Sequence, residues 1–208
     1  MYEIIETPNR IFLIMEHCCN GELFKYITSK NRLKEEEACR LFQQLISGIE
    51  YLGELGIAHR DIKPENFIIT PKQHVQLIDF NVSRRWNPQT EKLMTETGTK
   101  MFNAPEILNS PSYDGKVDIW SIGASLYTLI SGGLPPFYEE NVARLKKMIL
   151  EEEPPYDSIE FKNFEPLGLD LLKKMLTKDP KMRPSAKECL NHTWFSPLNI
   201  KSLNIYDQ

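Results

Sequence analysis

The spacing of hydrophobic and polar residues predicts a β-hairpin followed by a long helix. Residues 2–7 and 10–17 are β-branched and apolar runs separated by a Pro-Asn pair, which predicts two strands joined by a short turn. From Glu35 onward apolar residues recur at three- and four-residue steps, as in a helix with one buried face, and Gly53 and Gly56 are expected to end it. The buried face would consist of Ala38, Leu41, Phe42, Leu45, Ile46, Ile49 and Leu52.

The rest of the chain predicts a second hairpin, a long loop and several helices. Residues 66–70 and 75–80 read as two strands joined by a four-residue turn. Residues 81–103 are polar, rich in threonine and without a period, which predicts a long loop, and loops of that length are usually functional. Helical spacing returns over 116–131, 141–150 and 167–176, and the S-x-x-E pattern of Ser185 and Glu188 predicts a capping box that opens a last helix. The pattern therefore predicts an α+β chain dominated by helices.

Composition narrows the class of protein. The 208 residues are 41% hydrophobic, enough for one substantial core, and no linker or repeat divides them. The formal net charge of -4 argues against a nucleic-acid or anionic-membrane surface, since both recruit basic stripes. The four cysteines lack C-x-x-C spacing and resemble cytosolic thiols, so we expect a cytoplasmic protein. The most apolar segment, 117–130, is shorter than the ~20 residues that cross a bilayer and should be a buried core helix.

The candidate chemistry lies in and just after the charged stretch at residues 58–69, AHRDIKPENFII. Asp61, Lys63, Asn66 and Asp79 are the residue types that a metal-assisted phosphate reaction requires: oxygen ligands for Mg²⁺, a cation for phosphate charge and a carboxylate that accepts a hydroxyl proton. Each also has an ordinary explanation when taken singly. An aspartate in a turn usually caps backbone amides, an asparagine can be a plain turn residue, and a lysine can be a solvated surface charge.

The order of several motifs resembles that of the eukaryotic protein kinases. HRDIKPEN at 59–66 matches the family's catalytic-loop pattern H-R-D-L-x-x-x-N, with Ile62 in the Leu position. This catalytic loop is followed by DFN at 79–81, NAPE at 103–106, DIWSIG at 118–123 and DPKMRPSAKECLNHTWF at 179–195. The resemblance covers essentially the whole chain and is strongest to serine/threonine kinases of the calcium/calmodulin-dependent type. It implies a kinase domain over 1–196, with 1–17 as a remnant of the N-terminal lobe, 18–196 as a helical C-terminal lobe and 197–208 as a tail.

The resemblance assigns roles to the charged residues. It makes Asp61 the base that orients the substrate hydroxyl, Lys63 the cation beside the transferring phosphate, and Asn66 and Asp79 the Mg²⁺ ligands. Lys63 is typical of the serine/threonine branch, and Thr99 stands where that branch places a threonine beside the catalytic loop, so serine and threonine are the expected acceptors.

The same resemblance implies an ATP site. The adenine ring would lie on Ile68, against a connector in which Met15 resembles the gatekeeper. The backbones of Glu16 and Cys18 would supply hydrogen bonds, and Glu22 resembles the ribose contact.

Other matched residues resemble architectural ones. Glu106 should form a buried ion pair with Arg183, Asp118 should hold the backbone of the catalytic loop, and His59 should pack under Phe80. Arg60 implies control by phosphorylation of the loop by an upstream kinase, with Thr95 as the expected acceptor and Thr97 as second choice.

Two departures from the family pattern leave alternatives open. No G-x-G-x-x-G and no V-A-I-K-like lysine precede the catalytic loop, so the sequence reads either as a fragment of a longer kinase or as a protein that has dispensed with full catalysis. Asn81 stands where the family has glycine, although asparagine tolerates left-handed backbone geometry better than most residues.

Protein substrates are the expected partners, and a rival function remains. Glu22 and Glu65 match positions that attract basic residues near the acceptor in related kinases. The rival is a pseudokinase-like interaction module that binds a partner through the apolar face of the first hairpin, around Ile4, Ile11 and Leu13.

Overall fold

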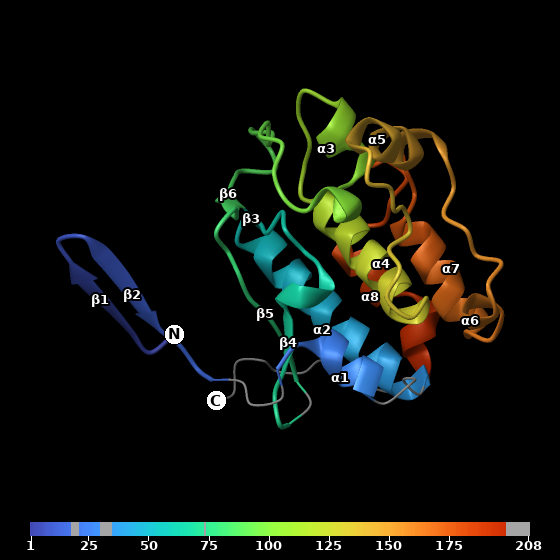
Figure 1. Ribbon diagram of the computed structural model, residues 1–208, viewed down its shortest axis with the longest axis horizontal. Coiled ribbons are helices and arrows are strands. Elements are labelled where there is room, and N and C mark those ends of the chain that lie inside the picture. Colours follow the sequence, from blue (N-terminus) through green and yellow to red (C-terminus); the bar gives the residue numbers. More distant parts are fainter. Residues whose placement is uncertain (18–20, 30–34, 73, 199–208) are drawn as a thin grey trace.

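The structure is a computed structural model that describes residues 1–17, 21–29, 35–72 and 74–198. A body of helices carries short pairs of strands along one side, and an N-terminal hairpin extends away from it (Figure 1). The predicted α+β class, with a helical C-terminal lobe and a small β remnant, is confirmed.

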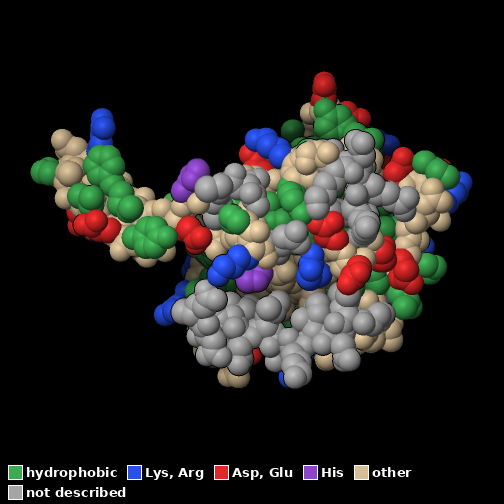
Figure 2. All heavy atoms as spheres, turned by 90° about the horizontal axis from the view of Figure 1, so that it is seen from below, with side chains coloured by type: hydrophobic (Ala, Val, Ile, Leu, Met, Phe, Trp, Pro, Cys, Tyr) green, Lys and Arg blue, Asp and Glu red, His purple; other side chains and the backbone are tan. Residues whose placement is uncertain are grey.

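The N-terminal hairpin forms as the sequence predicts. Strands β1 (Glu3–Thr7) and β2 (Arg10–Ile14) pair antiparallel, and the Thr7 hydroxyl donates to the Arg10 carbonyl across the turn at 3.0 Å. Every residue of both strands is exposed, and Figure 2 shows several hydrophobic side chains on the surface of the hairpin among acidic and basic ones. The prediction that Ile4, Ile11 and Leu13 form an exposed apolar surface is confirmed.

Helix α2 (Glu35–Glu54) and helix α4 (Lys116–Ile130) form the centre of the core. All seven predicted face residues of α2 are buried, and α4 is buried on nearly all sides, as predicted for the most apolar segment of the chain. Helix α2 runs past Gly53, so that glycine does not end it, whereas Gly56 follows the helix with a φ of 64°. Among the described residues, no helix combines the length and apolar character needed to span a membrane.

The remaining long helices pack around this pair. Helix α7 (Pro166–Met175) lies against α4, where Gly123 meets Met175 and Leu176, and α8 (Ala186–Leu190) lies against α2. The capping box of Ser185 and Glu188 is confirmed, with both reciprocal hydrogen bonds present. Helix α5 is also close to its predicted range. The structure adds short helices with no clear period in the sequence; the bounds of these and of α5 are α1 Leu23–Ser29, α3 Pro105–Asn109, α5 Val142–Glu151, α6 Ile159–Lys162, η1 Pro64–Asn66, η2 Lys100–Phe102 and η3 Thr193–Leu198.

Short strands bracket the charged loop. Strand β4 (Phe67–Ile69) pairs with β5 (Val75–Leu77), which confirms the second hairpin. The expectation of one long loop over 81–103 needs correction. Strand β6 (Arg84–Arg85) pairs with β3 (Ile57–Ala58), Leu93 bridges to Tyr113, and η2 begins at Lys100. These pairings join residues far apart in sequence, so local periodicity does not reveal them.

Candidate active site

Asp61 stands at the centre of a compact hydrogen-bond cluster between the catalytic loop and the segment before η2. One carboxylate oxygen, Oδ1, accepts from both the backbone amide and the hydroxyl of Thr99, each at 2.9 Å. The other, Oδ2, lies 3.0 Å from the Lys63 ammonium, which also donates to the Thr99 hydroxyl at 3.0 Å. These contacts confirm the expected place of Thr99 beside the catalytic loop.

These contacts set the charge state of Asp61. Its partial burial alone would raise the pKa, but the hydrogen bonds from Lys63 and Thr99 and the positive charge of Lys63 outweigh burial and hold the pKa below its usual range. Asp61 is therefore an ionised acceptor at neutral pH, oriented by donors on two sides.

Asp118 fixes the backbone of the loop from within the core. Its two carboxylate oxygens accept from the amides of His59 at 2.8 Å and Arg60 at 2.9 Å. Arg60 has a φ of 68°, a left-handed conformation that is costly for a residue with a side chain and that these bonds stabilise. The predicted role of Asp118 is confirmed.

Gly98 allows Thr99 to reach Asp61. Its φ is 85°, and a Cβ atom there would lie 2.4 Å from the Arg60 carbonyl oxygen and 2.8 Å from Oδ1 of Asn103. No side chain fits this approach without moving the backbone. The glycine therefore brings the segment close enough for Thr99 to bind the carboxylate.

Asn66 links Asp61 to the strand that leads to Asp79. The Asn66 side-chain amide donates to the Asp61 carbonyl at 2.8 Å, and the Asn66 carbonyl accepts from the amide of Ile78 at 3.0 Å. Asp79 follows directly, exposed and with a φ of 66°. The two acids thus lie in one connected group of loops.

Asn66 and Asp79 fit a magnesium ion in residue type. The hydrogen bond to Asp61 uses the side-chain nitrogen of Asn66 and does not involve the side-chain oxygen of Asn66. Asp79 offers an exposed carboxylate. Mg²⁺ is commonly held by one or two protein oxygens together with water and phosphate. Within the part of the chain that the structure describes, no group of three or more His, Cys, Asp or Glu could hold a metal by itself.

His59 contacts the residues on both sides of Asp79. Its Nε2 lies 3.0 Å from the Ile78 carbonyl, and its ring meets that of Phe80 edge-on with a centroid distance of 4.7 Å. This confirms that His59 packs against Phe80.

Three of the predicted nucleotide residues lie around strand β4. Glu22 forms a backbone bridge with Ile68, and Ile68 is paired across the sheet with Gln76. The Gln76 side chain donates to the Glu16 carboxylate at 3.4 Å, so Glu16 lies at the same place. Met15 is 61% exposed, and Cys18 lies outside the described residues.

Glu106 and Arg183 form the predicted buried ion pair. The guanidinium donates to the two carboxylate oxygens at 2.6 and 2.9 Å, and the side chains are 0% and 7% exposed for Arg183 and Glu106. The pair joins α3 to the segment before α8.

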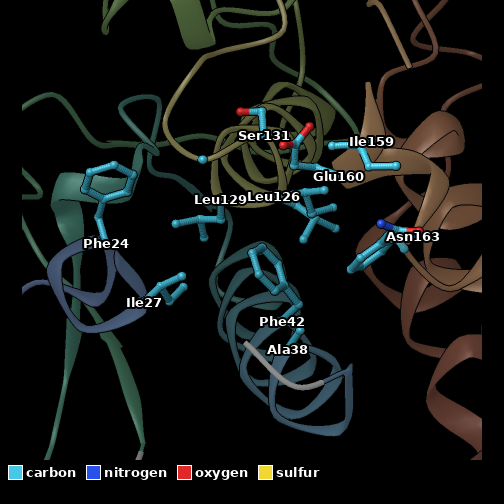
Figure 3. A pocket seen from close by; sticks show the side chains of 13 residues that line it. Phe24, Ile27, Ala38, Phe42, Leu126, Leu129, Ser131, Ile159, Glu160 and Asn163 are labelled. Atoms are coloured by element: carbon cyan, nitrogen blue, oxygen red, sulfur yellow. The ribbon is translucent and has the colours of Figure 1, made fainter. Parts of the chain in front are cut away.

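A pocket of about 390 Å³ lies away from Asp61. It opens between α1, α2, α4 and α6, with Phe24, Phe42 and Ile159 among its lining residues (Figure 3). None of the predicted catalytic residues lines it, so the pocket is separate from the candidate site.

Comparison with known proteins agrees with this arrangement. The chain is 41% identical over 196 residues to "Maternal embryonic leucine zipper kinase" of Xenopus tropicalis. The aligned region covers 93% of the chain and 29% of that protein. It is 41% identical to "Serine/threonine protein kinase OSK3" of Oryza sativa subsp. indica, covering 94% of the chain and 37% of that protein. It is 39% identical to "SNF1-related protein kinase catalytic subunit alpha KIN12" of Arabidopsis thaliana, covering 100% of the chain and 42% of that protein.

The chain thus spans less than half the length of these relatives. The family model described as "Protein kinase domain" matches residues 1–195, nearly the whole described chain. With an ionised Asp61 held by Lys63, Asn66 and Thr99, and the loop fixed by Asp118, this chain belongs to the protein kinase domain family.

Proposed function

We propose that this chain is the catalytic region of a serine/threonine protein kinase that transfers the γ-phosphate of ATP to hydroxyl groups of protein substrates. The single observation that carries the proposal is the cluster around Asp61, in which an ionised carboxylate, a lysine and a threonine meet within 3.0 Å. Phosphoryl transfer needs mostly positioning and charge stabilisation, and this cluster offers both.

Each residue has a distinct role in the proposed reaction. Asp61 orients the acceptor hydroxyl and accepts its proton through the oxygen that faces Lys63, while Thr99 holds the carboxylate in place. Lys63 lies beside Asp61 and can stabilise negative charge on the transferring group. When bound, ATP with Mg²⁺ supplies the phosphoryl group and a Lewis acid, and Asn66 and Asp79 are the residues that would hold the ion.

The nucleotide would lie along strand β4. Ile68 is half-buried and offers an apolar surface, and Glu16 and Glu22 lie next to it through the contacts of Gln76 and of the backbone bridge. Glu22 also forms an ion pair with Lys25 at 2.7 Å. A ribose hydroxyl or a basic substrate side chain would have to share the Glu22 carboxylate with Lys25.

Basic protein segments suit the surface near the acceptor. Glu22 and Glu65 are acidic, and Glu65 is exposed directly within the catalytic loop. The negative charges of Glu22 and Glu65 would favour substrates with Arg or Lys near the acceptor residue.

Thr95 is the proposed site for an activating phosphate from an upstream kinase. It is exposed, and a single hydroxyl, that of Tyr113, separates its backbone carbonyl from the Arg60 guanidinium. A phosphate on Thr95 would bring negative charge near a buried arginine beside Asp61.

Phosphate transfer to matched peptides tests the proposal. Three peptides that differ only in a serine, threonine or tyrosine acceptor, with arginines upstream, are incubated with the chain, ATP labelled at the γ-phosphate, and Mg²⁺. We expect label on the serine and threonine peptides and none on the tyrosine peptide, and loss of labelling when EDTA removes the metal. Label on tyrosine alone, or transfer unaffected by EDTA, contradicts the proposal.

A second candidate function rests on the exposed hairpin. Isolated two-stranded hairpins are marginal in water, and this one exposes Ile11 at 67% and Leu13 at 53%. Such a surface suits a binding partner whether or not phosphate is transferred. An Asp61→Ala variant that keeps the full biological effect of the chain would favour this interaction role over catalysis.

A further inference from the structure

The guanidinium of Arg60 is enclosed and therefore depends on a few acceptors. Arg60 is only 9% exposed, and its Nε donates to the Val82 carbonyl at 2.8 Å, with Nη2 directed to the same oxygen. An enclosed guanidinium with unmet donors is costly. The remaining nitrogen, Nη1, donates to the hydroxyl of Tyr113 at 3.3 Å.

The hydroxyl of Tyr113 carries this contact on to Thr95. It donates to the Thr95 carbonyl at 2.6 Å while it accepts from Arg60, so both its donor and acceptor capacities are used. Tyr113 is buried, with 4% exposure, and lies in the connection between α3 and α4.

A backbone pairing fixes Tyr113 against the same segment. The amide of Leu93 donates to the Tyr113 carbonyl at 2.9 Å, and the amide of Tyr113 donates to the Leu93 carbonyl at 2.8 Å. Lys92 lies 3.4 Å from the Asp114 carboxylate beside this pair. Leu93 is fully buried, so the bridge is anchored in the core.

We propose that Tyr113 is a positioning residue for phosphoryl transfer, and that its hydroxyl couples residues 93–99 to the catalytic loop through Arg60. The inference rests on the proposed function. Thr95 is four residues before Thr99, whose amide and hydroxyl hold the Asp61 carboxylate, and Gly98 lies directly against the Arg60 carbonyl. Tyr113 and Asp118 thus act on the two ends of Arg60, its side chain and its amide.

The test uses Tyr113→Phe, which keeps the ring and removes only the hydroxyl. Hydrogen–deuterium exchange of peptides that cover residues 93–99 is measured in the full chain. We expect exchange there to become faster by roughly tenfold, since the lost hydroxyl served a charged donor and a carbonyl at once. We also expect kcat for peptide phosphorylation to fall by roughly the same factor, with KM for ATP unchanged, because the contact does not touch strand β4.

The chain offers a matched control in Tyr127→Phe. Tyr127 is also a buried tyrosine, and its hydroxyl donates to a backbone carbonyl, that of Pro155, but this tyrosine lies within helix α4. This variant should leave exchange over 93–99 and the kcat unchanged. A loss caused merely by removing a buried hydroxyl would appear in both variants.

A second variant, Arg60→Gln, removes the other side of the contact. It should accelerate exchange over 93–99 as Tyr113→Phe does, and the double variant should be no faster than the stronger single one. Unchanged exchange in either folded single variant, or additive effects in the double variant, overturns the proposal. Exchange does not require catalysis, so these arms can fail or succeed independently of the proposed kinase activity.

Discussion

At the scale of single residues, the ionisation of Asp61 depends on its neighbours more than on its own chemistry. Burial favours the neutral acid, and the contacts with Lys63 and Thr99 reverse that preference. Because these contacts lower the pKa, Asp61 remains ionised at a pH where a buried carboxyl without such contacts would take up a proton. If Asp61 is the base of the proposed phosphoryl transfer, the acidic side of its pH profile should therefore depend on Lys63.

Lys63→Met should move that acidic limb to higher pH. Without the ammonium 3.0 Å from Oδ2, burial of Asp61 is less opposed and its pKa rises, so activity is lost sooner as the pH falls. The measurement is kcat/KM for peptide phosphorylation as a function of pH. Lys72→Met, an exposed lysine in the turn between β4 and β5, is the control and should leave the limb in place. An unmoved limb in Lys63→Met would mean that Asp61 is not the group that titrates.

At the scale of elements, the body is held together by side chains that join distant segments. The ion pair of Glu106 and Arg183 connects α3 to the segment before α8, and the Arg183 guanidinium also donates to the carbonyls of Thr177 and Lys116. The buried arginine thus binds three segments of the chain at once, at Glu106, Lys116 and Thr177. Its loss of a partner should affect folding of the whole body and not only of α3.

Glu106→Gln should lower the free energy of unfolding by about 3 to 5 kcal/mol, because it leaves a buried guanidinium without its counter-charge. Asp170→Asn is a matched control, since it also removes a carboxylate from an ion pair, but Asp170 and Lys174 are half exposed. That variant should cost at most about 1 kcal/mol. Urea unfolding followed by circular dichroism measures both. Equal costs in the two variants would contradict the role given to the buried pair.

Sequence predicts the elements whose burial is periodic and misses those set by distant contacts. Helix α2 shows one apolar face, and α4 contains the most apolar segment of the chain with apolar residues at helical spacing, so both are visible in the sequence. Helices α1 and α3 contain fewer than eight residues each, too few for a period to appear. Strand β6 exists because it pairs with β3, far from it in sequence, and a two-residue strand has no pattern of its own.

The candidate site follows the same division. The motif around Asp61 and the later Asp79 identify the chemical groups, because a phosphate reaction requires those residue types. The contacts of Tyr113 with Arg60 and Thr95 join segments 53 and 18 residues apart, and no motif or spacing marks them. Only the folded chain reveals that this tyrosine touches the catalytic loop.

At the scale of the whole molecule, a hairpin with an apolar surface stands apart from a well-packed helical body (Figure 1). The strands pair with one another, and their side chains remain exposed on both faces. The stability of the body should therefore be nearly independent of the hairpin, while self-association should depend on it.

Ile11→Lys combined with Leu13→Lys should reduce self-association without changing the melting temperature of the body by more than about 2 °C, because exposed positions contribute little to stability. Sedimentation velocity at several concentrations and thermal unfolding measure the two effects. A clearly lower melting temperature would show that the hairpin is packed against the body, contrary to the structure.

The central claim is that Asp61 serves phosphoryl transfer, and the most direct test is the rate at which the chain and its Asp61→Asn variant transfer phosphate from Mg²⁺-ATP to a serine peptide. Asparagine keeps the size of the side chain and cannot accept the hydroxyl proton as a carboxylate does. General-base catalysis is worth roughly 10² to 10⁴ in rate, so the account predicts a fall of at least about a hundredfold with the fold preserved by circular dichroism. Equal rates in the two proteins would contradict it.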